Sequence, residues 1–212
     1  ISIDRFINKN IALIYKYMLY YEEKFLCKFV KNFIFITKGL KDYYFKKCKI
    51  KNYKKFLISP SGVDIKLFKK VKTNVRELYK VKKDDILIGS VGGIAKIRKL
   101  DEFLPIFNEV IKKNKKVKLM FIGTGDSLGD IKEKVKKLYL QDNIIFTGNI
   151  AHKEVPRYIS AFNFGLCHLP NIFVYENSFP LKILEYLSCD IPVLASELKT
   201  HRDIAERLNR VY

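Results

Sequence analysis

The feature that most constrains the fold is a regular alternation of short apolar runs with longer amphipathic segments, which begins near residue 85. The apolar runs predict strands at 86–91, 117–122, 144–147, 164–169 and 192–195. The segments between and after them predict helices at 100–114, 127–140, 152–162, 181–189 and 200–209. Alternation of this kind is typical of βαβ units, in which helices cover both faces of a parallel sheet. We therefore predict an α/β fold with a parallel sheet.

The first part of the chain has the same kinds of element but too few of them for a whole domain. Residues 11–31 place apolar side chains at helical spacing, and 33–36 and 56–58 are expected to be strands. Thr37 is placed to cap a helix between these strands. We interpret 1–58 as the C-terminal end of one domain, 59–84 as a hinge and the first part of the next domain, and 85–212 as a ligand-binding domain. Because the chain starts inside what reads as a continuing segment, we expect it to be a piece of a longer protein.

The net charge is strongly positive and unevenly distributed. The chain carries 41 basic and 22 acidic side chains, a net charge of +19, and residues 1–80 hold 20 and 6 of them, a balance of 20 − 6 = +14. With 16 Phe and 13 Tyr, the chain is no disordered basic tail. It also lacks the run of about 20 apolar residues that spans a membrane. The excess fits phosphates of a nucleotide, of nucleic acid or of anionic lipid, or else a Lys-rich composition without functional meaning.

The positive charge suggests two possible macromolecular partners, nucleic acid and an anionic membrane surface. Only 7 of the basic residues are Arg, which disfavours sequence-specific nucleic-acid recognition. The amphipathic segment 11–31 suits an anionic membrane surface, with packing against the sheet as the alternative. The four cysteines, Cys27, Cys48, Cys167 and Cys189, form no CxxC pair and have no His at metal-ligand spacing. We therefore expect reduced thiols, no metal site, and a cytoplasmic protein that is peripheral to the membrane if 11–31 binds it.

Glycines directly follow three of the predicted strands. Gly92-Gly93, Gly123-Thr124-Gly125 and Gly148-Asn149 stand at the carboxyl ends of 86–91, 117–122 and 144–147. Ligands of parallel α/β sheets bind outside the carboxyl ends of the strands. Glycine lets the backbone approach a ligand closely or adopt a positive φ there. This edge is therefore the predicted ligand site.

A segment at 177–186 carries the best candidate chemistry. Pro180 suits the first turn of a helix that Asn177 or Ser178 caps, and the free N–H groups of that turn favour an anion. Lys182 adds a cation, while Glu185, one turn further on, can accept hydrogen bonds from a ribose diol. From the first glycine loop, Arg98 offers a planar fork to a diphosphate. Each residue alone has an ordinary reading as surface charge or helix punctuation, and the joint placement favours a site.

These residues belong to a set of motifs that resembles the glycosyltransferase family 4 group, retaining sugar transferases with the GT-B fold. The motifs are SPSGVD at 59–64 with Phe68, GGI at 92–94 with Arg98-Lys99, FIGTG at 121–125, FTGNI at 146–150 with VPRY at 155–158, and SFPLKILEY at 178–186 with IPV at 191–193. The resemblance implies two Rossmann-like domains, of which 85–212 is the donor-binding domain and 1–58 the end of the acceptor-binding one.

The resemblance also implies an activity, with no metal or other cofactor required. A sugar moves from a nucleotide-sugar donor to a glycan or lipid-linked acceptor with retention of configuration, in cell-surface polysaccharide or glycolipid synthesis. Arg98 and Lys182 are expected to bind the donor diphosphate, and Glu185 the ribose. The remaining expected contacts are Gly92, Gly93 and Gly125 in the glycine loops, Asn149 and Ile150 beside the base, and Phe179, Pro180 and Leu181 through their backbone.

Three positions depart from the family pattern, and they keep rival readings open. Gly93 stands where the family has an Arg that binds the diphosphate, and Asp190 stands where it favours Gly. Asn177 replaces the Glu that faces the transferred sugar, so its amide is the catalytic candidate at that place. The rivals are a catalytically inactive homologue, a basic module that binds nucleic acid or an anionic surface, and an epimerase or phosphorylase relative, for which His168 would be the His at a strand end.

Overall fold

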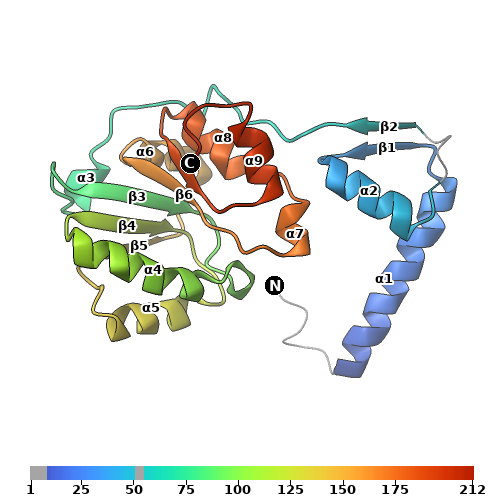
Figure 1. Ribbon diagram of the computed structural model, residues 1–212, viewed down its shortest axis with the longest axis horizontal. Helices are drawn as coiled ribbons and strands as arrows, with labels where there is room; N and C mark the ends of the chain where they lie inside the picture. Colours follow the sequence, from blue (N-terminus) through green and yellow to red (C-terminus); the bar gives the residue numbers. More distant parts are fainter. Residues whose placement is uncertain (1–8, 51–54) are drawn as a thin grey trace. The chain divides into compact units, whose positions relative to one another are not determined.

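The computed structural model describes residues 9–50 and 55–212, which form two compact units, one ending at Pro60 and one running from Ser61 to Tyr212 (Figure 1). We call them unit 1 and unit 2. Parts of the predicted first domain, 1–8 and 51–54, lie outside the described residues. Residues 61–84 belong to unit 2, where Phe68 and Val75 are buried in its core. The hinge at 59–84 stays a prediction.

Unit 1 is a small α/β arrangement. Its elements are α1 (Lys9–Phe29), β1 (Asn32–Phe35), α2 (Lys38–Lys47) and β2 (Lys55–Ile58), and the two strands pair in parallel. The predicted cap is confirmed, since the Leu40 N–H donates to Thr37 Oγ1 over 3.1 Å. Phe45 of α2 packs against Phe33, Phe35 and Phe56 of the strands.

Unit 2 contains a five-stranded sheet in the order β5-β4-β3-β6-β7, and every pair in it is parallel. The strands are β3 (Ile86–Val91), β4 (Val117–Ile122), β5 (Ile144–Gly148), β6 (Phe164–Cys167) and β7 (Val193–Ala195). The helices are α3 (Val75–Leu78), α4 (Leu100–Lys113), α5 (Leu128–Lys137), α6 (Val155–Ile159), α7 (Phe173–Glu176), α8 (Leu181–Ser188) and α9 (Lys199–Ala205), with short 3₁₀ turns η2 (Lys96–Arg98) and η3 (His152–Glu154). The predicted parallel sheet is thus confirmed.

Two hydrophobic cores lie on opposite faces of this sheet, because side chains alternate along each strand. Leu119 and Phe121 of β4 pack with α4 and α5, whereas Met120 and Ile122 pack with α3, α6, α8 and α9. Figure 1 shows α4 and α5 together on one side of the strands. Both faces are covered, as a parallel sheet requires.

The predicted boundaries fail where a short local structure replaces a longer element. The helix expected at 152–162 is η3 followed by α6, which ends at Ile159, and the last helix ends at Ala205. The strand expected at 164–169 ends at Cys167. Helices α3 and α7, four residues each, were not expected, because four residues are too few to show a helical repeat.

Candidate functional site

The order of the strands defines one crevice. β3 is flanked by β4 on one side and by β6 on the other, because the chain runs from β3 through β4 to β5 in one direction and then crosses back to place β6 on the other side of β3. Such a switch point is where open α/β sheets bind their ligands, outside the carboxyl ends of the strands. The loop after β3, with η2, and the start of α8 are the segments that supply side chains here.

Tyr186 fixes α8 across this switch point. Its hydroxyl accepts the Val91 N–H over 2.8 Å at the end of β3 and donates to the Leu166 carbonyl of β6 over 3.4 Å. The ring is fully buried and lies over Gly165, where a Cβ would approach it to 2.4 Å. Sequence reasoning placed Tyr186 in a motif but missed this role, which the lack of a side chain at Gly165 makes possible.

Arg98 and Lys182 converge at the end of β3. A Cβ on Gly92 would lie 3.0 Å from Lys182 Nζ and 3.1 Å from an Arg98 guanidinium nitrogen. Gly92 also has a φ of +121°, which other residues rarely adopt. Within the part of the chain that the structure describes, neither side chain forms a hydrogen bond or ion pair. The structure therefore brings two unpaired cations to one point beside the backbone of Gly92.

The electrostatics of this point are set by burial. Burial, and after it the neighbouring Arg98 guanidinium, lower the pKa of Lys182 to about 8, against the opposing effects of Cys167 and Glu185. Burial raises the pKa of the Glu185 carboxyl, and His152 and Lys182 oppose that shift. No hydrogen bond joins the Glu185 carboxylate to any described residue. A cationic end and a half-buried carboxylate thus lie one helical turn apart on α8.

A cavity of about 180 Å³ lies at the ends of β3, β4 and β5. Its lining includes Gly92, Gly93, Asn149 and Ile150, together with Val91, Ile122, Gly123, Thr124 and Val155. Drug-sized ligands occupy pockets of about 300–1,000 Å³, so this cavity suits one ring or group of a larger ligand. Four of the predicted contact residues therefore share one cavity wall.

Other predicted site residues have mainly structural environments. Gly125 is absent from the cavity lining, and a Cβ on it would come within 2.3 Å of the Ile94 carbonyl oxygen, so its glycine allows two loops to meet. Phe179 packs against the core, Pro180 is the N-cap residue of α8, and Leu181 is the first residue of that helix.

The predicted side-chain cap of α8 is wrong. Pro180 occupies the cap position, one residue earlier than expected, and no side chain caps the helix. The Asn177 amide instead donates to the Phe173 carbonyl over 2.8 Å, and the Ser178 hydroxyl donates to the Tyr175 carbonyl over 3.3 Å. Both side chains turn back because α7 ends here and leaves carbonyl groups that need donors.

Asp190 shows why its position favours glycine. Its φ is +62°, in the left-handed region, where Asp is tolerated better than most residues. Its carboxylate forms ion pairs with Lys70, at 3.0 Å, and with Arg210. These contacts hold the pKa of Asp190 below its usual range, the Arg210 hydrogen bond contributing most. Asp190 is therefore accommodated by its own local contacts, which do not involve Arg98 or Lys182.

The histidines and cysteines form no second site. His168 packs on the Phe103 ring, with centroids 5.0 Å apart, and His201 is buried with Nδ1 2.7 Å from the Ser196 carbonyl oxygen and Nε2 3.7 Å from Cys167 Sγ. None of the four cysteines forms a disulfide. Among the described residues, no three His, Cys, Asp or Glu side chains are grouped so that they could hold a metal ion.

Comparison with known proteins gives a consistent result. The family model described as "Glycosyl transferases group 1" matches residues 71–209. The alpha-monoglucosyldiacylglycerol synthase of Streptococcus pneumoniae is 34% identical over 106 residues, which are 50% of this chain and 23% of that enzyme. This chain therefore spans about a quarter of that relative's length.

Solved structures show the same fold. Anabaena HepE in complex with UDP superimposes with a TM-score of 0.68 at 14% identity, over 82% of this chain and 47% of that one. WaaG, a glycosyltransferase involved in lipopolysaccharide biosynthesis, gives 0.64 at 20% identity, over 82% of this chain and 46% of that one. The predicted GT-B architecture, with its Rossmann-like parallel sheet, is confirmed.

Proposed function

The chain belongs to the glycosyl transferases group 1 family, and on that premise we propose that unit 2 binds a nucleotide-sugar donor at the switch point of its sheet. The observation that carries this proposal is the convergence of Arg98 and Lys182 on the backbone of Gly92, with no anion in the described chain to pair with them. A diphosphate supplies that anion. Glu185, one turn further along α8, is then placed to accept hydrogen bonds from the ribose hydroxyls.

The chemistry of transfer follows from this arrangement. The bond between the anomeric carbon and the diphosphate oxygen breaks as a bond to an acceptor hydroxyl oxygen forms. Negative charge grows on the departing phosphate oxygen, which takes up the proton of that hydroxyl. Arg98 and Lys182 stabilise that charge, and preorganised groups of this kind are commonly worth about 3 kcal/mol each. We propose that the sugar keeps its anomeric configuration and that no metal takes part.

The departures at Gly93 and Asn177 define the rival within the family, a homologue that binds donor without transferring sugar. Gly93 provides no side chain for the diphosphate. The Asn177 amide donates to Phe173, so its nitrogen is committed to α7. Donor binding that persists without any turnover of the complete protein would favour this rival over the active transferase.

For the acceptor, we propose a glycan or lipid-linked molecule of the cell surface, reached from the cytoplasmic membrane face. The pneumococcal relative is named for a glycolipid product, and WaaG for lipopolysaccharide synthesis. Among the described helices, none has the length and apolar character to cross a bilayer. We propose a peripheral contact.

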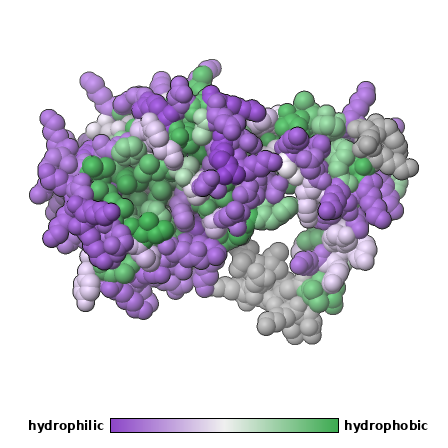
Figure 2. Space-filling view, in the orientation of Figure 1, coloured by the Kyte–Doolittle hydropathy of each residue, from purple (hydrophilic) through white to green (hydrophobic). Residues whose placement is uncertain are grey.

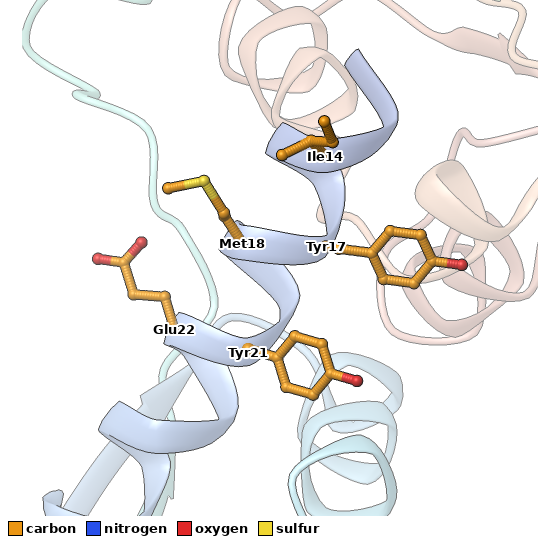
Figure 3. Close-up of a pocket in the computed structure, with 5 residues that line it drawn as sticks. All are labelled: Ile14, Tyr17, Met18, Tyr21 and Glu22. Atoms are coloured by element: carbon orange, nitrogen blue, oxygen red, sulfur yellow. The ribbon is translucent and has the colours of Figure 1, made fainter. Parts of the chain in front are cut away.

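Helix α1 supports that contact. It meets α2 through its polar side, where Glu23 accepts a hydrogen bond from the Tyr44 hydroxyl and pairs with Lys47. The opposite side carries exposed apolar residues, and Ile14 and Met18 are about 60% exposed. Figure 3 shows five side chains of this helix that line a pocket, with Tyr17 and Tyr21 projecting to one side and Met18 and Glu22 to the other. Figure 2 shows apolar side chains, in green, at the surface of unit 1.

The donor proposal is tested by calorimetric titration with UDP-, GDP- and ADP-sugars. We expect one of them to bind, and Arg98→Ala and Glu185→Ala to weaken that binding at least tenfold. Lys96→Ala is the matched control, because Lys96 lies in the same η2 turn but is exposed and lies 3.8 Å from Asp130. Binding by no nucleotide, or binding that both substitutions leave intact, rejects the donor site.

The membrane proposal is tested by co-sedimentation with phosphatidylglycerol vesicles and with neutral phosphatidylcholine vesicles. We expect binding to the anionic vesicles and its loss in Met18→Glu. Tyr139→Glu, at a residue that is 88% exposed in unit 2, is the control for added charge. If the wild type binds neither kind of vesicle, the membrane proposal fails.

A further inference from the structure

His152 has a distinctive position beside the proposed donor site. It begins η3, between Ile150 and Val155, which both line the cavity at the ends of the strands. One edge of its ring packs on the buried Phe68 ring, with centroids 5.4 Å apart. Its side chain is otherwise exposed. The ring is therefore anchored on one side and open to a ligand on the other.

The imidazole of His152 also acts on Glu185. Burial raises the pKa of the Glu185 carboxyl overall, and the nearby His152 imidazole opposes this rise more than Lys182 on the same helix does. Yet no ion pair or hydrogen bond joins His152 to Glu185 in the described chain. Each group therefore keeps its hydrogen-bonding capacity for a third molecule.

We propose that His152 is a ribose-binding residue that shares the hydroxyls of the donor nucleoside with Glu185. This inference rests on the proposed function. The chemistry is complementary, because a carboxylate only accepts hydrogen bonds, whereas an imidazole has at least one ring N–H to donate. A ribose hydroxyl donates to Glu185 and at the same time accepts from His152. Arg98 and Lys182 hold the diphosphate, so the donor is fixed at both ends of its nucleotide.

A site built in this way discriminates against a nucleotide that lacks a hydroxyl. The 2′-deoxy analogue lacks the hydroxyl that would hydrogen-bond to the half-buried Glu185 and to His152. Sites that are built to bind a hydroxyl reject such analogues strongly. We expect the wild-type chain to prefer the ribonucleotide by at least tenfold, since a hydrogen bond to a charged group is commonly worth that factor or more.

The test measures the dissociation constants of UDP, GDP and ADP, and of the 2′-deoxy form of each, by calorimetry on the wild-type chain. The same titrations are made with two variants of His152. His152→Ala removes the whole ring, whereas His152→Phe keeps a ring on Phe68 but has no nitrogen. Lys153→Ala, at the next residue of η3, is the matched control. Thermal unfolding of each variant reports whether the fold is kept.

The inference expects both His152 variants to bind the ribonucleotide about tenfold more weakly and to lose most of the preference over the deoxy form. It is overturned if the variants keep the wild-type preference, even with weaker overall binding, because a purely structural role lowers both affinities together. It is also overturned if the wild type shows no preference. In these cases the diphosphate site stands as long as Arg98→Ala weakens binding, whereas failure of all nucleotides to bind rejects the proposed function as well.

Discussion

Replacing Lys182 by methionine is expected to make the empty protein more stable and, at the same time, to abolish donor binding. Lys182 is a partly buried cation beside a second cation, and no carboxylate of the described chain forms an ion pair with it. Methionine keeps most of the apolar stem of lysine without its charge. The change therefore separates the cost of the charge from the packing of the side chain.

The size of the effect follows from the pKa of Lys182. Burial, and then Arg98, lower that pKa from 10.5 to about 8. Each pKa unit corresponds to about 1.4 kcal/mol, so the charged form costs the folded protein about 3 kcal/mol at pH 7. Because the folded-state pKa lies below the unfolded-state value, the unfolded chain binds more protons between pH 8 and 10.5. The free energy of unfolding of the wild type therefore rises across that window.

The assay is thermal unfolding of wild type and Lys182→Met, at pH 7 and at pH 10. For a chain of this size, about 3 kcal/mol corresponds to an increase in Tm of about 6–12 °C for the variant at pH 7. This difference should shrink strongly at pH 10, where folded wild type is largely deprotonated at this group. Lys96→Met controls for loss of an exposed lysine. A variant that is less stable at pH 7, or a difference equal at both pH values, would refute the reasoning.

Three further substitutions and one control substitution test the site and the elements that support it. Gly93→Arg should fold normally, because a Cβ there meets only the Thr124 carbonyl oxygen, at 3.7 Å. In calorimetry it should tighten binding of the nucleotide-sugar that the wild type binds by about tenfold, and unchanged affinity would contradict this. Tyr186→Phe leaves the buried Val91 N–H without its acceptor and should lower the free energy of unfolding in urea by about 1–3 kcal/mol. Gly125→Ala forces a Cβ against the Ile94 backbone and should cost about 1–3 kcal/mol, whereas Gly129→Ala, in open space on α5, should be neutral or stabilising. Equal effects of the two glycine changes would show that the Ile94 contact is not restrictive.

Much of the fold could be predicted because the sheet of unit 2 is buried on both faces. Strands in such a sheet are short, mainly apolar runs, and the strand predicted at 117–122 has the same bounds as β4. The glycines that end β3 and β4 marked the ligand edge for the same reason, since a backbone close to a ligand needs them. Both predictions depend only on residues that are neighbours in the sequence, so they do not require knowledge of the tertiary structure.

The failures lie where tertiary geometry decides. Asn177 and Ser178 are ordinary cap residues by type, but α7 intervenes and takes their hydrogen bonds. A helix of four residues is too short to show a helical repeat of apolar residues, so α7 could not be predicted from the sequence. Similarly, the pattern of residues 11–31 predicted α1, but the sequence alone left open whether its apolar face packs or stays exposed.

The net charge of the chain, taken as a total, says little about the site, and the partners of individual charges say more. Exposed cations such as Lys99 and Lys112 pair with carboxylates one helical turn away, and such pairs contribute little to stability. Arg98 and Lys182 lie far apart in sequence and are partly buried, and no carboxylate in the described chain pairs with them. A fold that places two cations together without an anion is destabilised until one binds. For this reason the unpaired cations at Gly92, rather than the basic surface of residues 1–80, are the charges from which a diphosphate donor can be argued.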